Sequence, residues 1–177
     1  NYDAWNRKMG AELHGLNQLE QGKLHFSTKG IERVIINGTR FIFGTMWGDG
    51  GPTLADQATT GRYLNDFRLI QRDDPLNEYP RRFTVPDMIG EFKEAKRAIT
   101  AHLEETFAGT TVVVTHHLPS RRLVSARFWP GDGSDGANGG FVGQCDDLLA
   151  RTEIAPKLWI HGHTHDTVDR ELWNTRI

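Results

Sequence analysis

Histidines gather at two places in this 177-residue chain, and both places follow an apolar run. Residues 112–120 read VVVTHHLPS, in which His116 and His117 come soon after three valines. Residues 158–166 read LWIHGHTHD, which contains His161, His163 and His165. Neutral imidazole is the commonest side-chain metal ligand near neutral pH. The residue types and their spacing therefore predict a metal site, suited to zinc or another borderline transition ion.

Each histidine group comes directly after a run that predicts a buried strand, TVVVT at 111–115 and KLWI at 157–160. Ligands bind at the carboxyl ends of the strands in open α/β sheets, so we expect the two groups to face one crevice. A lone histidine at a strand end is more often a hydrogen-bonded structural residue, and that interpretation is given to His161. Asp166 and Asp169 lie nearby, and a carboxylate can bridge two cations, but aspartate is also an ordinary turn residue.

A mixture of helical and strand patterns around these motifs predicts an α/β fold. Residues 32–47, ERVIINGTRFIFGTMW, carry two β-rich runs on either side of Asn37-Gly38, which predicts a hairpin. From Thr84 to Gly109 apolar residues recur at three- and four-residue steps, which predicts a helix. Other patterns predict loops at 48–62, 71–83 and 118–143, helices at 4–20 and 145–151, and a strand or hairpin at 166–177.

The composition is that of a globular protein, with 37% hydrophobic and 25% charged residues. A formal net charge of -2 offers no basic field for nucleic acid. No apolar run approaches the roughly 20 residues that a membrane helix needs, so no membrane partner is expected. Cys145 is the only cysteine, which excludes an internal disulfide and favours a cytoplasmic location. We expect one domain over residues 1–177.

The two histidine motifs resemble the last two metal motifs of the calcineurin-like metallophosphoesterases. That family's pattern runs D-x-H, G-D-x-x-D, G-N-H-E or G-N-H-D, a strand-end histidine, and G-H-x-H. The resemblance implies an αββα sandwich and two divalent metal ions (Mn, Fe, Zn, Co or Ni) that hydrolyse a phosphate ester with activated water. His116, His163 and His165 are then the metal ligands. His117 and Arg121 are the candidates for binding substrate, because guanidinium matches the geometry of phosphate.

The first three motifs of the family are not all present. The chain contains no D-x-H and no G-N-H, and its one G-D-x-x-D, at 131–135, lies in a glycine-rich segment where such residues are ordinary turn formers. We therefore expect an incomplete sandwich, the C-terminal portion of a phosphoesterase whose N-terminal strands and motifs, or another chain, complete the sheet. No catalytic proton donor is assigned. The alternatives are a non-catalytic protein-binding scaffold with the same fold and, because structural zinc sites favour cysteine, less readily an unrelated zinc protein.

Overall fold

The computed structural model describes residues 30–177 except residues 75 and 78. These residues form a mixed α/β structure with one six-stranded sheet, one two-stranded ribbon and four α-helices. The helix predicted over residues 4–20 lies outside the described residues. No helix of the described part is both long and apolar enough to span a bilayer.

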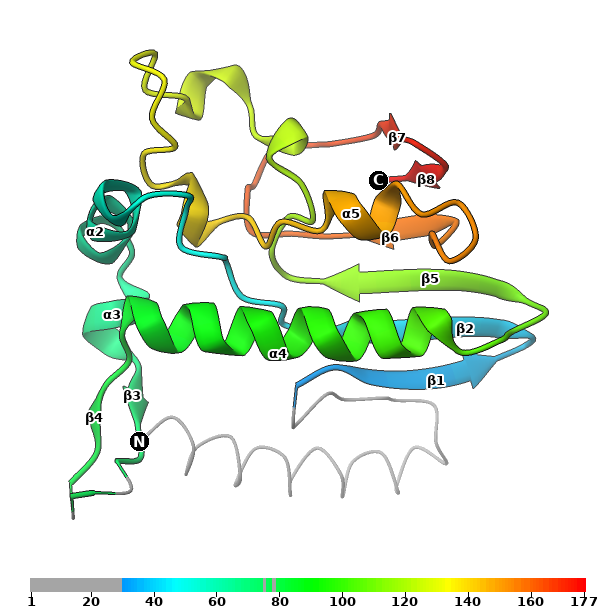
Figure 1. Ribbon diagram of the computed structural model, residues 1–177, viewed down its shortest axis with the longest axis horizontal. Coiled ribbons are helices and arrows are strands. Elements are labelled where there is room, and N and C mark those ends of the chain that lie inside the picture. The colour runs from blue at the N-terminus through cyan, green and yellow to red at the C-terminus, as the bar shows by residue number, and fades with distance from the viewer. Residues whose placement is uncertain (1–29, 75, 78) are drawn as a thin grey trace.

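The six-stranded sheet has the order β1-β2-β5-β6-β8-β7 and a parallel centre. Strands β2, β5, β6 and β8 pair in parallel, and each edge strand, β1 and β7, pairs antiparallel with its neighbour. The strands span β1 (Glu32–Ile36), β2 (Thr39–Gly44), β5 (Thr110–Thr115), β6 (Leu158–Ile160), β7 (Glu171–Leu172) and β8 (Thr175–Arg176). The α/β class is confirmed, and both strands that precede histidines lie side by side in the centre of the sheet (Figure 1).

The predicted hairpin is confirmed by the turn between β1 and β2. Asn37 and Gly38 have φ angles of 48° and 75°, and both values lie in the left-handed region that a tight two-residue turn requires. Asparagine and glycine enter this region at low cost, because one has a short polar side chain and the other has none.

Helix α4 (Val85–Glu104) packs along one face of the sheet (Figure 1). Its start has the predicted cap: Thr84 Oγ1 accepts from the backbone N–H of Asp87, whose carboxylate accepts from the Thr84 N–H. The helix ends at Glu104 rather than near Gly109, because residues 105–109 turn the chain into β5. Its apolar stripe joins one core with buried residues of three strands and of α5 (Asp146–Leu149): Ile42, Phe92, Ile99, Val113, Leu148, Leu149 and Trp159.

Two segments that the sequence predicted as loops contain regular structure. Residues 48–62 include most of helix α2 (Leu54–Tyr63), which begins with a capping box between Thr53 and Asp56. Residues 71–83 include the short ribbon of β3 (Gln71–Arg72) and β4 (Arg81–Arg82), and α3 (Asp66–Leu69) comes just before it. The loop prediction for 48–62 was wrong because glycines and polar residues hid a helix that has almost no apolar stripe.

The long segment at 118–143 has no α-helix or strand, as predicted, but three 3₁₀ turns give it local order: Arg121–Leu123, Ala126–Phe128 and Asn138–Gly140. A backbone hydrogen bond from Asp49 N–H to the Val142 carbonyl (2.8 Å) ties this segment to the chain that follows β2. The second sheet of an αββα sandwich does not occur among the described residues, where the six strands form a single layer.

Candidate metal centre

Strands β5 and β6 place the two histidine groups at the same edge of the sheet. In the parallel register Val114 pairs with Ile160, so both strands end together and run straight into the histidines. The Gly162 N–H donates to the His116 carbonyl at 3.1 Å, and the His116 N–H donates to the Thr45 carbonyl after β2 at 3.1 Å. Three successive strand ends are therefore joined by backbone hydrogen bonds beyond the sheet.

His116 and His163 meet directly at this edge. The distance from Nε2 of His116 to Nδ1 of His163 is 3.0 Å, and the ring centroids are 4.8 Å apart in an edge-on arrangement. Two imidazole nitrogens that bind one tetrahedral zinc ion at about 2.0–2.1 Å lie about 3.3 Å apart. The two nitrogens are thus spaced much as two ligands of one ion.

His117 forms the inner wall of this cluster. It is 2% exposed, and its ring lies 4.4 Å from the His163 ring and 5.5 Å from the Trp47 ring, centroid to centroid. Nδ1 faces the Thr45 carbonyl at 3.4 Å, while Nε2 is buried with no hydrogen-bond partner. A backbone carbonyl that accepts from one ring nitrogen fixes the tautomer and leaves the other nitrogen as an electron-pair donor.

Nε2 of His163 is also buried, and the Gly140 backbone is the hydrogen-bonding group that acts on this ring to raise its pKa. Nε2 of His117 is the buried nitrogen without a partner, and such nitrogens are uncommon and costly in protein interiors. Its position beside His163 indicates a place that can receive an additional polar group or ion.

Removal from water, which is partial for the exposed His116, lowers the pKa of all three imidazoles. It lowers the pKa of His163 to about 4, with the neighbouring His116 ring lowering the pKa further, and it lowers the pKa of His117 to about 3. Burial also lowers the pKa of His116, which Asp66 partly opposes. Neutral nitrogens at pH 7 are the form that binds a cation.

The turn that carries the second histidine group has an unusual backbone. His163 and His165 both have positive φ angles, 64° and 56°, which residues other than glycine adopt only at a cost. A Cβ atom on Gly162 would lie 3.5 Å from Nδ1 of His116, an ordinary van der Waals contact. The strained, left-handed backbone is therefore at His163 and His165 rather than at Gly162. Such strain is typical of functional turns.

His165, the third predicted ligand, is exposed and stands apart from the other two, although its charge lowers the pKa of both His116 and His163. No three His, Cys, Asp or Glu residues in the described part of the chain converge closely enough to hold a metal together. Asp66 at the start of α3, which sequence reasoning did not select, is the carboxylate whose charge acts on both His116 and His163. Asp66 lies in the stretch LNDFRLI at 64–70, which shares in the resemblance to the metallophosphoesterases, but the residue itself was not chosen as a ligand.

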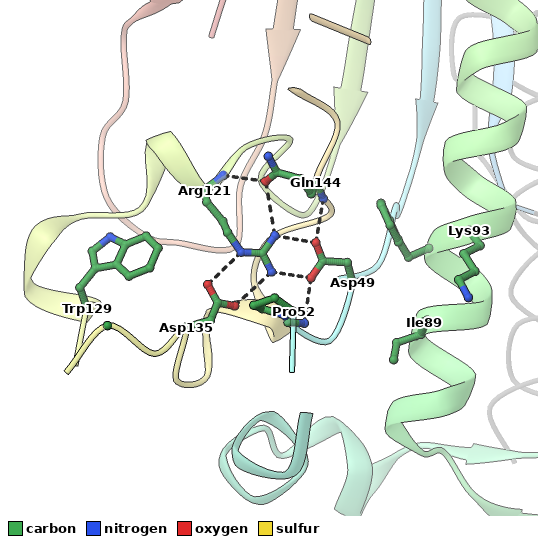
Figure 2. Close-up of a pocket in the computed structure, with 11 residues that line it drawn as sticks. Asp49, Pro52, Ile89, Lys93, Arg121, Trp129, Asp135 and Gln144 are labelled. Carbon is green, nitrogen blue, oxygen red and sulfur yellow. Dashed lines mark hydrogen bonds and ion pairs between the residues drawn. The ribbon is translucent and has the colours of Figure 1, made fainter. Parts of the chain in front are cut away.

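Arg121 lies in a different pocket, of about 620 Å³, where its guanidinium is held by acidic residues (Figure 2). It makes paired hydrogen bonds to Asp49 (2.6 and 2.6 Å) and to Asp135 (2.8 and 3.0 Å), and one to Gln144 (3.3 Å). Burial lowers the pKa of Arg121, but the hydrogen bonds and charges of Asp49 and Asp135 outweigh burial and raise it. The donors that the sequence assigned to a phosphate are therefore occupied by carboxylates.

The remaining candidates have partners of their own. His161 Nδ1 lies 3.1 Å from the Gly162 carbonyl, and Asp169 pairs with Arg176. Asp166 pairs with Arg127 through one carboxylate oxygen, and its other oxygen is buried without a partner.

Comparisons with protein-family models, curated proteins and solved structures found no match for this chain. The chemistry of the site therefore rests on its own residues: neutral, closely spaced imidazole nitrogens at the carboxyl edge of a parallel sheet. Such an arrangement suits a divalent transition ion that binds nitrogen.

Proposed function

We propose that this chain carries the histidine part of a metal-dependent phosphoesterase site. The observation that supports the proposal most strongly is the 3.0 Å approach of His116 Nε2 to His163 Nδ1, between residues 47 positions apart in the chain. The same two residues carry the resemblance to the metallophosphoesterase motifs. The αββα sandwich and the two-metal site belong to this proposal.

In this proposal His116 and His163 hold a divalent ion, and His165 joins them or serves a second ion from the exposed side. Bound divalent ions activate water and stabilise the charge that builds on phosphate oxygens. His117 and Trp47 close the inner wall and keep bulk water out, which strengthens every electrostatic interaction at the site. The Thr45 carbonyl holds the orientation of His117.

Hydrolysis of an aryl phosphate by protein from the complete natural reading frame tests the proposal, with Mn²⁺, Co²⁺ or Zn²⁺ added and with a chelator present. His163→Ala removes a ligand and is expected to lower kcat/KM at least 100-fold. His161→Ala is the matched control, since His161 lies two residues away and its ring contacts the carbonyl of Gly162 at 3.1 Å, and the variant is expected to stay within about threefold. An unchanged rate of hydrolysis, both with the chelator present and in the His163→Ala variant, would refute the proposal.

A non-catalytic scaffold is the second candidate. Exposed apolar side chains in and around the β3–β4 ribbon, Leu69, Leu76 and Tyr79, favour it because large exposed apolar residues mark interaction surfaces. Metal binding without turnover of any phosphate ester would favour the scaffold over the enzyme.

A further inference from the structure

A second pocket, of about 340 Å³, lies beside the histidine cluster, and the described residues that line it include no His, Cys, Asp or Glu. Its lining comes from helix α2, from the 118–143 segment and from Thr164, which sits between the two histidines of the G-H-T-H turn. The volume is at the lower end of the range for pockets that bind small molecules.

One aromatic ring is common to this pocket and the histidine cluster. Phe141 lines the pocket, and its centroid lies 4.7 Å from that of His163. Thr164 follows His163 directly in the chain and lines the pocket as well. The pocket therefore lies next to the histidine cluster, and Phe141 touches both.

The lining combines aromatic and aliphatic carbon with the polar side chains of Thr59, Asn138 and Thr164. Tyr63, Phe128 and Phe141 supply three rings, and aliphatic carbon comes from Leu118, Val124 and Pro130. The rings of Tyr63 and Phe141 lie 6.5 Å apart at 58°, within the range of aromatic pairs. The three rings favour a flat aromatic group.

The positive charge that lines this pocket is paired with a carboxylate. Arg127 is the single charged residue among the described residues that line it. Its guanidinium pairs with Asp166 and lies over the Phe128 ring at 4.5 Å. The Arg127 guanidinium is therefore already paired with a carboxylate and an aromatic ring, so it attracts a second phosphate only weakly.

We propose that this pocket binds an aromatic leaving group, so that the substrates are small aryl phosphate esters. Its role in substrate binding rests on the proposed function, which places the phosphate at His116 and His163. Hydrolysis breaks the P–O bond to the aromatic group, water supplies the oxygen that replaces it, and a proton from that water ends on the released aryl oxygen. The aromatic alcohol is then the product that occupies the pocket.

Binding of 1-naphthol, which needs neither metal nor turnover, tests the pocket by itself. Phe128→Ala removes a ring that is 45% exposed, so the fold should tolerate it. Trp129→Ala is the matched control, because Trp129 is 40% exposed and lines the other pocket, around Arg121 (Figure 2). We expect Phe128→Ala to raise the Kd of 1-naphthol at least fivefold and Trp129→Ala to change it less than twofold.

Kinetics with metal complete the experiment. Phe128→Ala should raise KM for 1-naphthyl phosphate at least fivefold, whereas Trp129→Ala should change it less than twofold. Equal effects of the two variants on 1-naphthol, or wild-type protein that does not bind it, would overturn the pocket assignment even if phosphate esters are hydrolysed. Selective 1-naphthol binding without hydrolysis of any ester would instead refute the phosphoesterase proposal and leave an aromatic-binding pocket.

Discussion

Arg121→Met is expected to be among the most destabilising single changes away from the apolar core. The side chain of Asp135 is 3% exposed and that of Asp49 is 15% exposed, and both carboxylates depend on the Arg121 guanidinium. Methionine retains the bulk of the side chain but removes all five of its hydrogen bonds. The buried Asp135 and the partly buried Asp49 then lose the guanidinium that pairs with both.

The expected loss of unfolding free energy comes from the carboxylates that lose the Arg121 guanidinium. Breaking a buried ion pair by removing one partner costs about 3–5 kcal/mol of unfolding free energy. Arg121→Lys keeps the charge but loses the paired geometry, so its cost should be intermediate. Arg122→Met is the control: this side chain is 63% exposed and lies 3.5 Å from Asp146, and such surface pairs contribute about 0–1 kcal/mol.

Urea unfolding followed by tryptophan fluorescence measures these differences. The order of unfolding free energies should be wild type and Arg122→Met together, then Arg121→Lys, then Arg121→Met. A loss of less than about 1 kcal/mol for Arg121→Met, or a loss equal to that of Arg122→Met, would show that the guanidinium does not hold the 118–143 segment in place. An Arg121→Met protein of normal stability with a selectively raised KM would restore the earlier expectation that Arg121 meets the phosphate.

Two further predictions concern single titratable groups. Asp87→Asn should lower the unfolding free energy by about 1–2 kcal/mol at pH 7, because the carboxylate caps α4 and accepts from Arg81. Hydrogen bonds from Arg81 and Thr84 lower the pKa of Asp87 from 3.8 to about 2, so this stabilisation is complete above pH 4 and is lost as the pH falls toward 2. Denaturant titrations of both proteins from pH 7 to pH 2 should converge in acid, and a constant difference would contradict the cause given. Burial raises the pKa of the Cys145 thiol, so a disulfide reagent at pH 8 should label it only on unfolding, and labelling of the native protein within seconds would contradict its position in the core.

The elements that the sequence predicted well are those whose local pattern agrees with their packing. The helix at 85–104 has an apolar stripe that matches the face it buries, and the hairpin turn has the residues that its φ angles require. Helix α2 was missed because its residues are mostly polar and its packing comes from the 3₁₀ turn at Asn138–Gly140 rather than from a stripe. The capping pair Thr53 and Asp56 was the one local signal for it.

For the candidate site, the sequence predicted where the histidines lie better than it predicted which side chains pair with Arg121. Parallel neighbours end at one edge, so strand-end histidines were bound to approach each other if β5 and β6 were adjacent. The partners of Arg121 could not be predicted in this way, because Asp49 lies 72 residues away and no periodic pattern links the two. Asp135 belonged to a G-D-x-x-D interpreted as a turn, whereas its side chain is almost completely buried against that arginine.

The burial of His117 could not be predicted from the local sequence either. Two adjacent histidines look alike in sequence, yet one is exposed and the other is buried behind Trp47. The strand alternation of β5 does not continue past Thr115, so it cannot assign a side to either ring.

The most direct test of the metal centre is a crystal of the protein grown with zinc and measured for anomalous scattering at the zinc edge. The account predicts a peak at about 2.0–2.1 Å from both His116 Nε2 and His163, with the direct hydrogen bond between the two rings replaced by the ion. Loss of that peak in His163→Ala crystals, but not in His161→Ala crystals, would identify the ligand. A crystal in saturating zinc that shows no peak there, with the two nitrogens still hydrogen-bonded at 3.0 Å, would contradict the account.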